Sequence, residues 1–558
     1  MIRLLVLLAA LLALPAAAQE RPPMAVNLAP VNDWSTEQPF LDVMKTARRW
    51  IGHKPGQWGG MDHAEIEAAG LLDAEGWPRA VPGDLGSIGT VILTDLPEEA
   101  QLHAGRYRLR FEGDGIVEVT GRARNVRYGK GEITFDFTPG PGPVDIRIQR
   151  TDRRGTGDPV RNITVVMERH AAAFDAGARF APEFLDVLRG FEVLRFMDWM
   201  NTNDSTQGSW ADRPLVSDFS YTRRGVPLEV MLALAQEVGA DPWFNMPHLA
   251  DEAYLRGFAG AVLAGLPAGR SVWVEYSNEL WNWQFLQAEW ADAQGKARWG
   301  EIHRGAQFSG MRAAEVADIW SEVFADARDR LVNVIATQTG WLGLEHDILN
   351  APLWQAEAEG NRPPHRAFDA YAVTGYFGHA LGTEKRTGML RAWLEDSLAA
   401  AEARATGRGL EGAAREAFVV AHRYDLATGR AAEELASGAH SGEAEDSLAD
   451  LAGRIFPYHA AVARAHDLRL VMYEGGTHVV GLGPDAQGDD LTDFFVHLNY
   501  VPVMGTLYDT LMAEWQAAGG EMFNVYSDVQ APSKWGSWGA LRYLGDDSPR
   551  WQAVARLK

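Results

Sequence analysis

Hydrophobic residues follow a helical period over most of the chain, and short apolar runs separate these helical stretches. Residues 227–240, 314–328 and 491–519 are examples of the amphipathic pattern. The apolar runs predict strands at residues 24–31, 192–200, 241–248, 271–279, 330–338, 368–377, 468–476 and 521–528. Strands that alternate with helices form a parallel sheet, and eight of them predict a (β/α)8 TIM barrel.

Residues 89–168 have a different pattern, in which apolar and polar positions alternate. Tyr107, Leu109 and Phe111 show this period of two, and segments rich in Gly and Pro at 138–143 and 155–159 separate the runs. The pattern predicts an antiparallel β-sandwich inserted between the first and second barrel strands. We expect residues 19–78 to begin the barrel, 79–169 to form the sandwich and 170–558 to complete the barrel.

A second insertion is predicted at about residues 380–450, where Ala, Glu and Arg dominate. This composition favours helices above the loop of the sixth strand. The sandwich is either a carbohydrate-binding module or a wall of the active-site groove. Because it leaves the barrel at the end of the first strand, we expect it on the catalytic side, as a wall.

The N-terminus has the features of a secretory signal peptide over residues 1–18. Arg3 supplies the positive charge, residues 4–14 form the apolar segment and residues 16–18 are a small-residue cleavage site. We therefore expect a secreted or periplasmic protein with no membrane insertion after cleavage.

Charge and composition narrow the class of ligand. The chain of 558 residues has 52 basic and 75 acidic residues, hence a net charge of −23, which disfavours nucleic acids and anionic membranes as partners. It has no cysteine, so disulfides and thiolate chemistry are excluded. The acidic run 484–493 lacks EF-hand spacing and is interpreted as a solvated loop. We expect no cofactor or metal, and the oligomeric state stays open.

Two glutamates end apolar strands of the predicted barrel. Glu279 ends the fourth strand and Glu474 lies near the end of the seventh, where barrel enzymes place their catalytic groups. A pair of carboxyl groups facing one pocket can cleave a glycosidic bond, one as acid and the other as nucleophile or base. Sugar rings stack on tryptophan, and several of the 20 tryptophans fall in or after strand ends, among them Trp199, Trp281, Trp535 and Trp538.

The segment VEYSNELWN, residues 274–282, together with Glu474, resembles glycoside hydrolase clan A, the family 5-like enzymes. The resemblance implies a retaining (β/α)8 hydrolase, with Glu279 as acid/base and Glu474 as nucleophile. It also implies that Asn278 holds the substrate 2-hydroxyl and that Arg195 pairs with the nucleophile. The remaining positions that match sugar- and nucleophile-contacting residues of the clan are His248, Tyr376 and Trp535 or Trp538. Leu280 stands where family 5 often has proline.

Electrostatic reasoning assigns different protonation states to the two glutamates. Arg195 beside Glu474 should favour the ionised nucleophile, whereas desolvation should keep Glu279 protonated. Glu275, on the same strand as Glu279, is interpreted as a buried carboxylate paired with an arginine.

The sequence therefore predicts a secreted glycoside hydrolase that cleaves β-glycosidic bonds of a polysaccharide or oligosaccharide. A non-catalytic glycan-binding protein on a degenerate barrel, or a structural envelope protein, is the alternative, because a fold does not determine function. The substrate is left open among glucan, mannan, xylan and bacterial exopolysaccharide.

Overall fold

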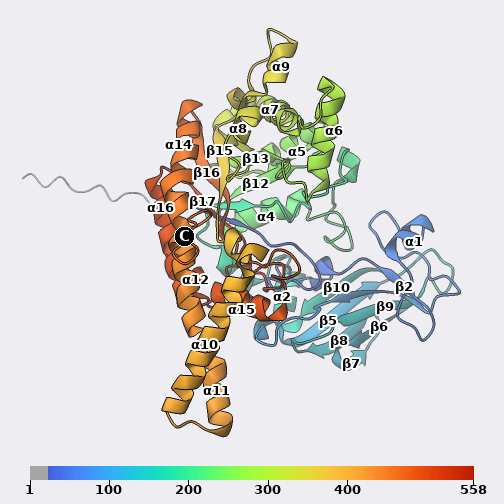
Figure 1. The fold of residues 1–558 in the computed structure, drawn as a ribbon. Helices are drawn as coiled ribbons and strands as arrows, with labels where there is room; N and C mark the ends of the chain where they lie inside the picture. The colour runs from blue at the N-terminus through green and yellow to red at the C-terminus, as the bar shows by residue number, and fades with distance from the viewer. Residues whose placement is uncertain (1–22) are drawn as a thin grey trace, which may run out of the picture.

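Eight parallel strands form a closed barrel in the computed structural model, which describes residues 23–558. The order around the barrel is the order of the chain (Figure 1). The strands are β1 (Met24–Asn27), β11 (Val193–Arg195), β12 (Asp241–Met246), β13 (Val272–Tyr276), β14 (Leu331–Ala336), β15 (Ala370–Phe377), β16 (Arg469–Thr477) and β17 (Phe523–Val525). The predicted barrel is confirmed, and the predicted signal peptide lies outside the described residues.

The inside of the barrel is packed by side chains that share one buried cluster. Its members are Ala25, Val193, Trp243, Trp273, Val332, Val334, Ala336, Ala370, Ala372, Val471, Tyr473 and Met522. Trp243 and Trp273 stack with their ring centroids 5.6 Å apart. Alanines on β1, β14 and β15 leave room for these two large rings, since a barrel interior must be filled to normal packing density.

Helices surround the barrel and bury their apolar sides against it. The longer ones are α4 (Leu228–Val238), α5 (Glu252–Gly265), α6 (Leu286–Trp299), α7 (Gly305–Val323), α14 (Phe456–Ala465), α15 (Asp489–Asn499) and α16 (Pro502–Ala517), and the shorter ones are α3 (Pro182–Leu188), α8 (Leu344–Asn350), α9 (Pro352–Glu357) and α17 (Pro549–Ala555). Local sequence sets their ends: Asp251 accepts the Tyr254 N–H at the start of α5. Gly239 ends α4 at a φ of 75°, a conformation that favours glycine.

The inserted domain is a sandwich of two antiparallel sheets. The four-stranded sheet has the order β10-β5-β8-β7 and the five-stranded sheet β3-β2-β4-β9-β6. The strands are β2 (Ile51–His53), β3 (Gly60–Met61), β4 (Ser87–Ile92), β5 (Gly105–Glu112), β6 (Gly115–Gly121), β7 (Arg124–Tyr128), β8 (Glu132–Phe137), β9 (Val144–Thr151) and β10 (Arg161–Met167). Strands β2 and β3 precede residue 79, and short helix α1 (His63–Ala68) follows them.

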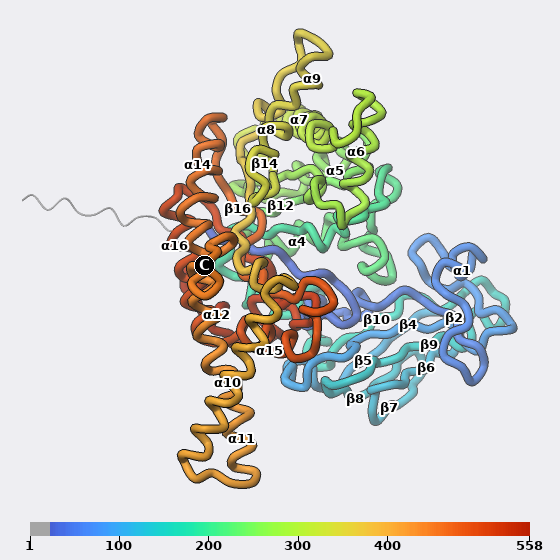
Figure 2. The backbone as a smooth tube through the Cα atoms, viewed as in Figure 1, coloured from blue at the N-terminus to red at the C-terminus, as the bar shows by residue number. Residues whose placement is uncertain are grey.

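Loops that leave the C-terminal ends of β1 and β11 hold the sandwich to the barrel (Figure 2). Asp33, in the loop after β1, accepts the Thr94 hydroxyl of the sandwich and forms an ion pair with Arg48. Phe219, in the loop after β11, packs into the sandwich core. The sandwich therefore stands at the rim where barrel enzymes place their active sites.

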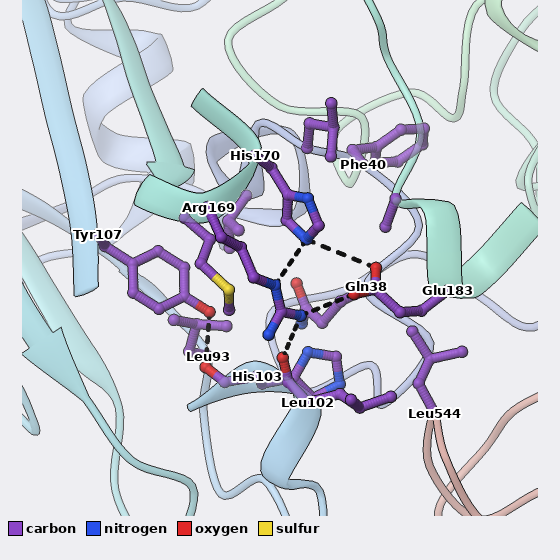
Figure 3. A pocket seen from close by; sticks show the side chains of 14 residues that line it. Gln38, Phe40, Leu93, Leu102, His103, Tyr107, Arg169, His170, Glu183 and Leu544 are labelled. Carbon is purple, nitrogen blue, oxygen red and sulfur yellow. Dashed lines mark hydrogen bonds and ion pairs between the residues drawn. The ribbon is translucent and has the colours of Figure 1, made fainter. Parts of the chain in front are cut away.

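A cavity of about 30 Å³, large enough for a water molecule, lies at the junction of sandwich and barrel (Figure 3). A polar contact forms part of its lining. Arg169 donates to the Leu102 carbonyl at 2.7 Å and to Glu183 at 2.9 Å. His170, which follows Arg169, lies 3.5 Å from the other oxygen of Glu183. Because Glu183 belongs to α3, this contact joins the end of the sandwich to a helix that packs against the barrel.

The second insertion is helical, as predicted. After β15 the chain forms α10 (Thr387–Gly407), α11 (Gly412–His422), α12 (Asp425–Ser437) and α13 (Leu448–Asp450). Helices α10 and α11 extend away from the barrel as an arm (Figure 1). Within residues 23–558, no helix has the length and apolar character of a membrane span.

The sandwich has its own hydrophobic core, so a change there should act on this domain. Phe135 is fully buried and stacks on Tyr107 with the ring centroids 5.5 Å apart. We expect Phe135→Ala to destabilise the sandwich by about 3–5 kcal/mol. Calorimetry should show a lower melting temperature, whereas exposed Arg127→Ala should stay within about 0.5 kcal/mol of the wild type. Equal melting curves for both variants would contradict a folded sandwich core.

Candidate active site

Arg195 is the centre of a buried polar network inside the barrel. It ends β11 with no exposed surface, and its guanidinium reaches both Glu474 and Glu275. Nη1 donates to Glu474 Oε1 at 2.7 Å and to Asn27 Oδ1 at 2.9 Å. Nη2 donates to Glu275 Oε2 at 2.9 Å and to Asn278 Oδ1 at 3.0 Å. One cation thus connects strands β1, β11, β13 and β16 and the first residues after β13.

Glu474 has a hydrogen-bond donor at each of its carboxyl oxygens. Oε1 accepts from Arg195, and Oε2 accepts from the Tyr376 hydroxyl at 3.0 Å. The pairing of Glu474 with Arg195 agrees with the expectation from sequence, and β15 supplies the tyrosine. Two donors, one at each oxygen, hold the carboxyl group in one orientation.

Glu279 lies just beyond the C-terminal end of β13 and is partly exposed. Its Oε1 accepts from the Tyr473 hydroxyl at 2.8 Å, and its Oε2 accepts from Asn282 at 2.8 Å. The backbone reaches this position through left-handed residues, with φ of 57° at Ser277 and 42° at Glu279. Such conformations are uncommon outside glycine and concentrate at functional sites.

Glu275 is a structural carboxylate, as the sequence predicted. Its Oε2 accepts from Arg195, from Trp243 Nε1 at 3.1 Å and from Asn245 Nδ2 at 2.8 Å. It is buried, and these donors offset part of the cost of burying its charge. Glu275 therefore takes a share of the positive charge of Arg195 that Glu474 would otherwise receive alone.

The electrostatics of Glu474 differ from the expectation. Burial raises its pKa to about 8, against Arg195 and Tyr376, which lower it, and the nearby charge of Glu279 raises it further. Arg195 does act in the expected direction and lowers the pKa of Glu474, but burial outweighs its effect. The influence of Glu279 on this pKa shows that its charge is felt at Glu474.

Aromatic rings cluster around Tyr376, the residue that donates to Glu474. Trp538 meets Tyr376 edge-on with centroids 5.9 Å apart and contacts Tyr526 at 5.7 Å. Tyr526 in turn lies 6.1 Å from Tyr376. Trp281 lies next to Glu279 and lines, with Glu275, a cavity of about 30 Å³. Trp535 is 63% exposed on the loop after β17.

Two other predicted positions lie apart from the glutamates. Trp199 is completely buried against Phe40 and Phe184 and donates to the Ala29 carbonyl at 3.1 Å. Its predicted contact with substrate is therefore wrong, since no face of the ring is free. His248 is buried edge-on against Trp290, and no hydrogen bond or ion pair of the described chain joins it to Glu279 or Glu474. Burial lowers its pKa, which favours the neutral imidazole.

A second group of buried carboxyl groups lies beside the barrel at β1 and β17. Glu37 and Asp528 are both buried, and the negative charge of Asp528 acts on Glu37. Burial raises the pKa of Glu37 well above its ordinary value, that of Asp528 to about 7 and that of neighbouring Asp198 to about 6. Within residues 23–558, no group of three or more histidines and carboxylates has an arrangement that could hold a metal ion.

Two residues of the network were not predicted from the sequence. Asn27 and Tyr473 are in the network, but each lies in an apolar run where a core role is the ordinary interpretation. Asn27 ends the observed β1, whereas the predicted strand continued to residue 31. A shorter first strand would have placed Asn27 at the strand end and marked it as a candidate.

Comparisons with known proteins give only distant matches to solved structures. No protein-family model matches the chain, and no curated protein matches it. A structure of two fungal β-1,4-galactanases is 11% identical over 68% of this chain and 96% of that chain, with a TM-score of 0.30. The β-glucosidase from Thermotoga maritima in complex with deoxynojirimycin is 11% identical over 70% and 87%, with a TM-score of 0.33. The endo-1,4-β-D-mannanase from Thermotoga petrophila RKU-1 is 12% identical over 67% and 92%, with a TM-score of 0.21.

Similarity at this level carries no argument about activity. The strand pairing of the chain itself defines its class, a (β/α)8 barrel with an inserted sandwich. Two glutamates and an arginine are joined in one network at the C-terminal end of this barrel.

The carboxyl pair Glu37–Asp528 should make stability depend on pH. In the unfolded chain both groups lose their protons near pH 4, whereas folding retains protons up to about pH 7 at Asp528. The folded state binds more protons in this window, so stability falls as pH rises through it. We expect Glu37→Gln, which keeps a donor toward Asp528 at every pH, to flatten this fall in thermal unfolding measured from pH 5 to pH 8.

Glu434→Gln is the matched control of opposite sign. Burial raises the pKa of Glu434, but hydrogen bonds from Ser441 and His440 and the charge of Arg386 outweigh it and lower the pKa. The wild-type carboxylate therefore stabilises the fold above its ordinary pKa, and the substitution should cost most at neutral pH. A pH dependence in Glu37→Gln that equals the wild type would contradict the raised pKa values of this pair.

Proposed function

We propose that the chain is a secreted, retaining glycoside hydrolase of the clan A type that cleaves β-glycosidic bonds of a neutral polysaccharide. The observation that carries the proposal is the linked pair of glutamates: Glu474 on Arg195 and Tyr376, and Glu279 on the tyrosine that precedes Glu474. A carboxyl pair that shares one pocket at the end of a barrel is the arrangement that glycosidic cleavage requires.

In the proposed mechanism Glu474 attacks the anomeric carbon and Glu279 gives its proton to the leaving oxygen. The glycosyl ester on Glu474 is then hydrolysed by water, which returns its proton to Glu279. Because a charge on Glu279 raises the pKa of Glu474, a proton on Glu279 favours the ionised nucleophile that this mechanism needs.

The side chains near Glu474 support a neutral substrate. Tyr376, Tyr526 and Trp538 present rings and a hydroxyl beside Glu474, and the one cation in the network is already bound by two carboxyl groups. Rings of this kind stack on the C–H faces of sugars. A charged sugar would meet no free counter-charge in this network.

Exposed tryptophans at the mouth of the barrel favour a polymeric chain as substrate. Trp34, Trp283, Trp341 and Trp535 are each more than half exposed and lie in the loops that follow β1, β13, β14 and β17. In the closed strand order β17 is next to β1, β13 is next to β14, and the two pairs are opposite each other. We infer that a linear chain crosses the mouth between these pairs and is cut internally.

Removal of the nucleophile tests the proposed reaction. We expect Glu474→Ala to lose at least about 10³-fold in kcat on a β-linked polysaccharide, with part of the activity on an activated aryl β-glycoside restored by azide. The azide product should have the α configuration, because the small anion enters from the side that the carboxylate occupied. Glu275→Gln is a poor control, since it disturbs Arg195; Glu183→Gln changes a carboxylate away from the pocket and should keep full turnover.

Unchanged hydrolysis by Glu474→Ala would contradict the proposal. Binding of the polysaccharide by the wild type without any new reducing ends would instead support a glycan-binding protein on the same barrel.

The aromatic rim is tested by substrate length. We expect Trp34→Ala and Trp341→Ala each to lower kcat/KM on the polymer about 5- to 50-fold, since a stacking surface contributes about 1–2 kcal/mol, and to leave an aryl glycoside unaffected. Trp58→Ala is the matched control, because Trp58 is 55% exposed, as Trp34 is, but lies on the β2–β3 hairpin of the sandwich. An equal effect of all three variants on the polymer would refute the rim.

A further inference from the structure

Strand β16 contains one extra residue at Tyr473. Opposite β15, Met472 pairs with Val373 and Glu474 pairs with Thr374, so Tyr473 has no partner of its own. The other edge shows the same irregularity, because Val471 faces Met522 on β17 and Gly475 faces Val525. Four residue steps on β16 therefore lie against three on β17, which defines a β-bulge.

The bulge directs two consecutive side chains into the barrel. In a regular strand neighbours point to opposite faces, so an inward Tyr473 would leave Glu474 pointing at the surrounding helices. Instead Tyr473 belongs to the cluster inside the barrel, and Glu474 meets Arg195 there. The bulge is thus what brings the nucleophile position to the same side as the tyrosine before it.

The backbone of the bulge is tied to the same network. The Tyr473 carbonyl accepts from Asn27 Nδ2 at 2.9 Å, and Asn27 Oδ1 accepts from Arg195. The Arg195 guanidinium also lies over the Tyr473 ring, 5.3 Å from its centroid. The carbonyl, the ring and the hydroxyl of Tyr473 therefore each contact another residue. Together these contacts hold Tyr473 in one position.

The Tyr473 hydroxyl differs in kind from the other partner of Glu279. Asn282 meets Glu279 Oε2 through its Nδ2, an amide nitrogen that can only donate, whereas a tyrosine hydroxyl can both donate and accept. It can donate to Oε1 when Glu279 is ionised and accept the proton of Oε1 when Glu279 is protonated. Burial raises the pKa of Tyr473 well above its ordinary value, so the hydroxyl stays neutral.

We propose that Tyr473 is a positioning residue that holds the Glu279 carboxyl group in place through both of its protonation states, and that the β-bulge links this position to that of Glu474. The inference rests on the proposed function. It predicts that proton transfer to the leaving group depends on the Tyr473 hydroxyl, whereas nucleophilic attack by Glu474 does not. A merely structural tyrosine would affect both steps alike.

The test is Tyr473→Phe, which keeps the ring inside the barrel and over Arg195. Its kcat/KM is compared on two aryl β-glycosides of the sugar that the wild type releases, one with a poor phenol leaving group and one with 2,4-dinitrophenol. We expect about a 10- to 100-fold fall on the poor leaving group and little change on the dinitrophenyl glycoside, which leaves without acid assistance. The alkaline limb of the pH profile should also move, because the ionised carboxylate loses a donor.

Tyr371→Phe is the control variant. Tyr371 is a fully buried tyrosine of the neighbouring strand β15, and its hydroxyl bonds His459 at 2.8 Å, so the substitution removes a comparable hydrogen bond away from Glu279. Loss of stability alone would lower both variants and both substrates together. An equal fall on the two glycosides, or none, in Tyr473→Phe would overturn the role of Tyr473 and leave the proposed function intact. A wild type that cleaves neither glycoside nor any β-linked polysaccharide would contradict the proposed function itself.

Discussion

The structure depends on a single guanidinium buried at the centre of the barrel. Arg195 meets Glu275 on one side and Glu474 on the other, and none of the three is more than 5% exposed. A buried charge is tolerated only with partners, and removal of one partner of such a pair typically costs about 3–5 kcal/mol. Four polar groups from three further strands or strand ends surround it, so the positions of these strand ends are fixed relative to one another.

The network has fewer cations than carboxyl groups, and this affects the protonation of the carboxyl groups. Two carboxyl groups share one cation while a third, Glu279, lies close by. The network therefore favours a proton on one of the groups, and the pKa of Glu474 near 8 expresses that preference. Glycosidic cleavage by retention needs such a pair, with one group charged and the other protonated. In the unliganded site this preference places a proton on Glu474, so the proposed attack requires that Glu474 first lose it.

Much of the fold and part of the site were predictable from local patterns. Apolar runs predicted all eight barrel strands, because strands that are buried on both faces contain few polar residues. Glu279 and Glu474 were predicted because charged residues at strand ends have no use in a core, whereas Arg195 was predicted from the resemblance to clan A. The pairing of Glu275 with an arginine was also predicted, and Arg195 meets it.

Other features depend on tertiary structure that a pattern does not contain. Trp199 lies shortly after the end of β11, yet its ring packs against Phe40 and Phe184. Phe40 is far from it in sequence, and Phe184 belongs to helix α3. Tyr473 reads as an ordinary strand residue, because a bulge is defined by the pairing with neighbouring strands. The pKa of Glu474 depends first on its burial, which only the assembled barrel determines.

The stereochemical course of hydrolysis tests the central claim most directly. Proton NMR of the first product released from a β-linked substrate distinguishes the two anomers before they equilibrate. The proposed pair of glutamates predicts that the β anomer appears first, because attack by Glu474 and then by water inverts the centre twice. Initial release of the α anomer would show that water attacks directly, and it would contradict the nucleophilic role of Glu474.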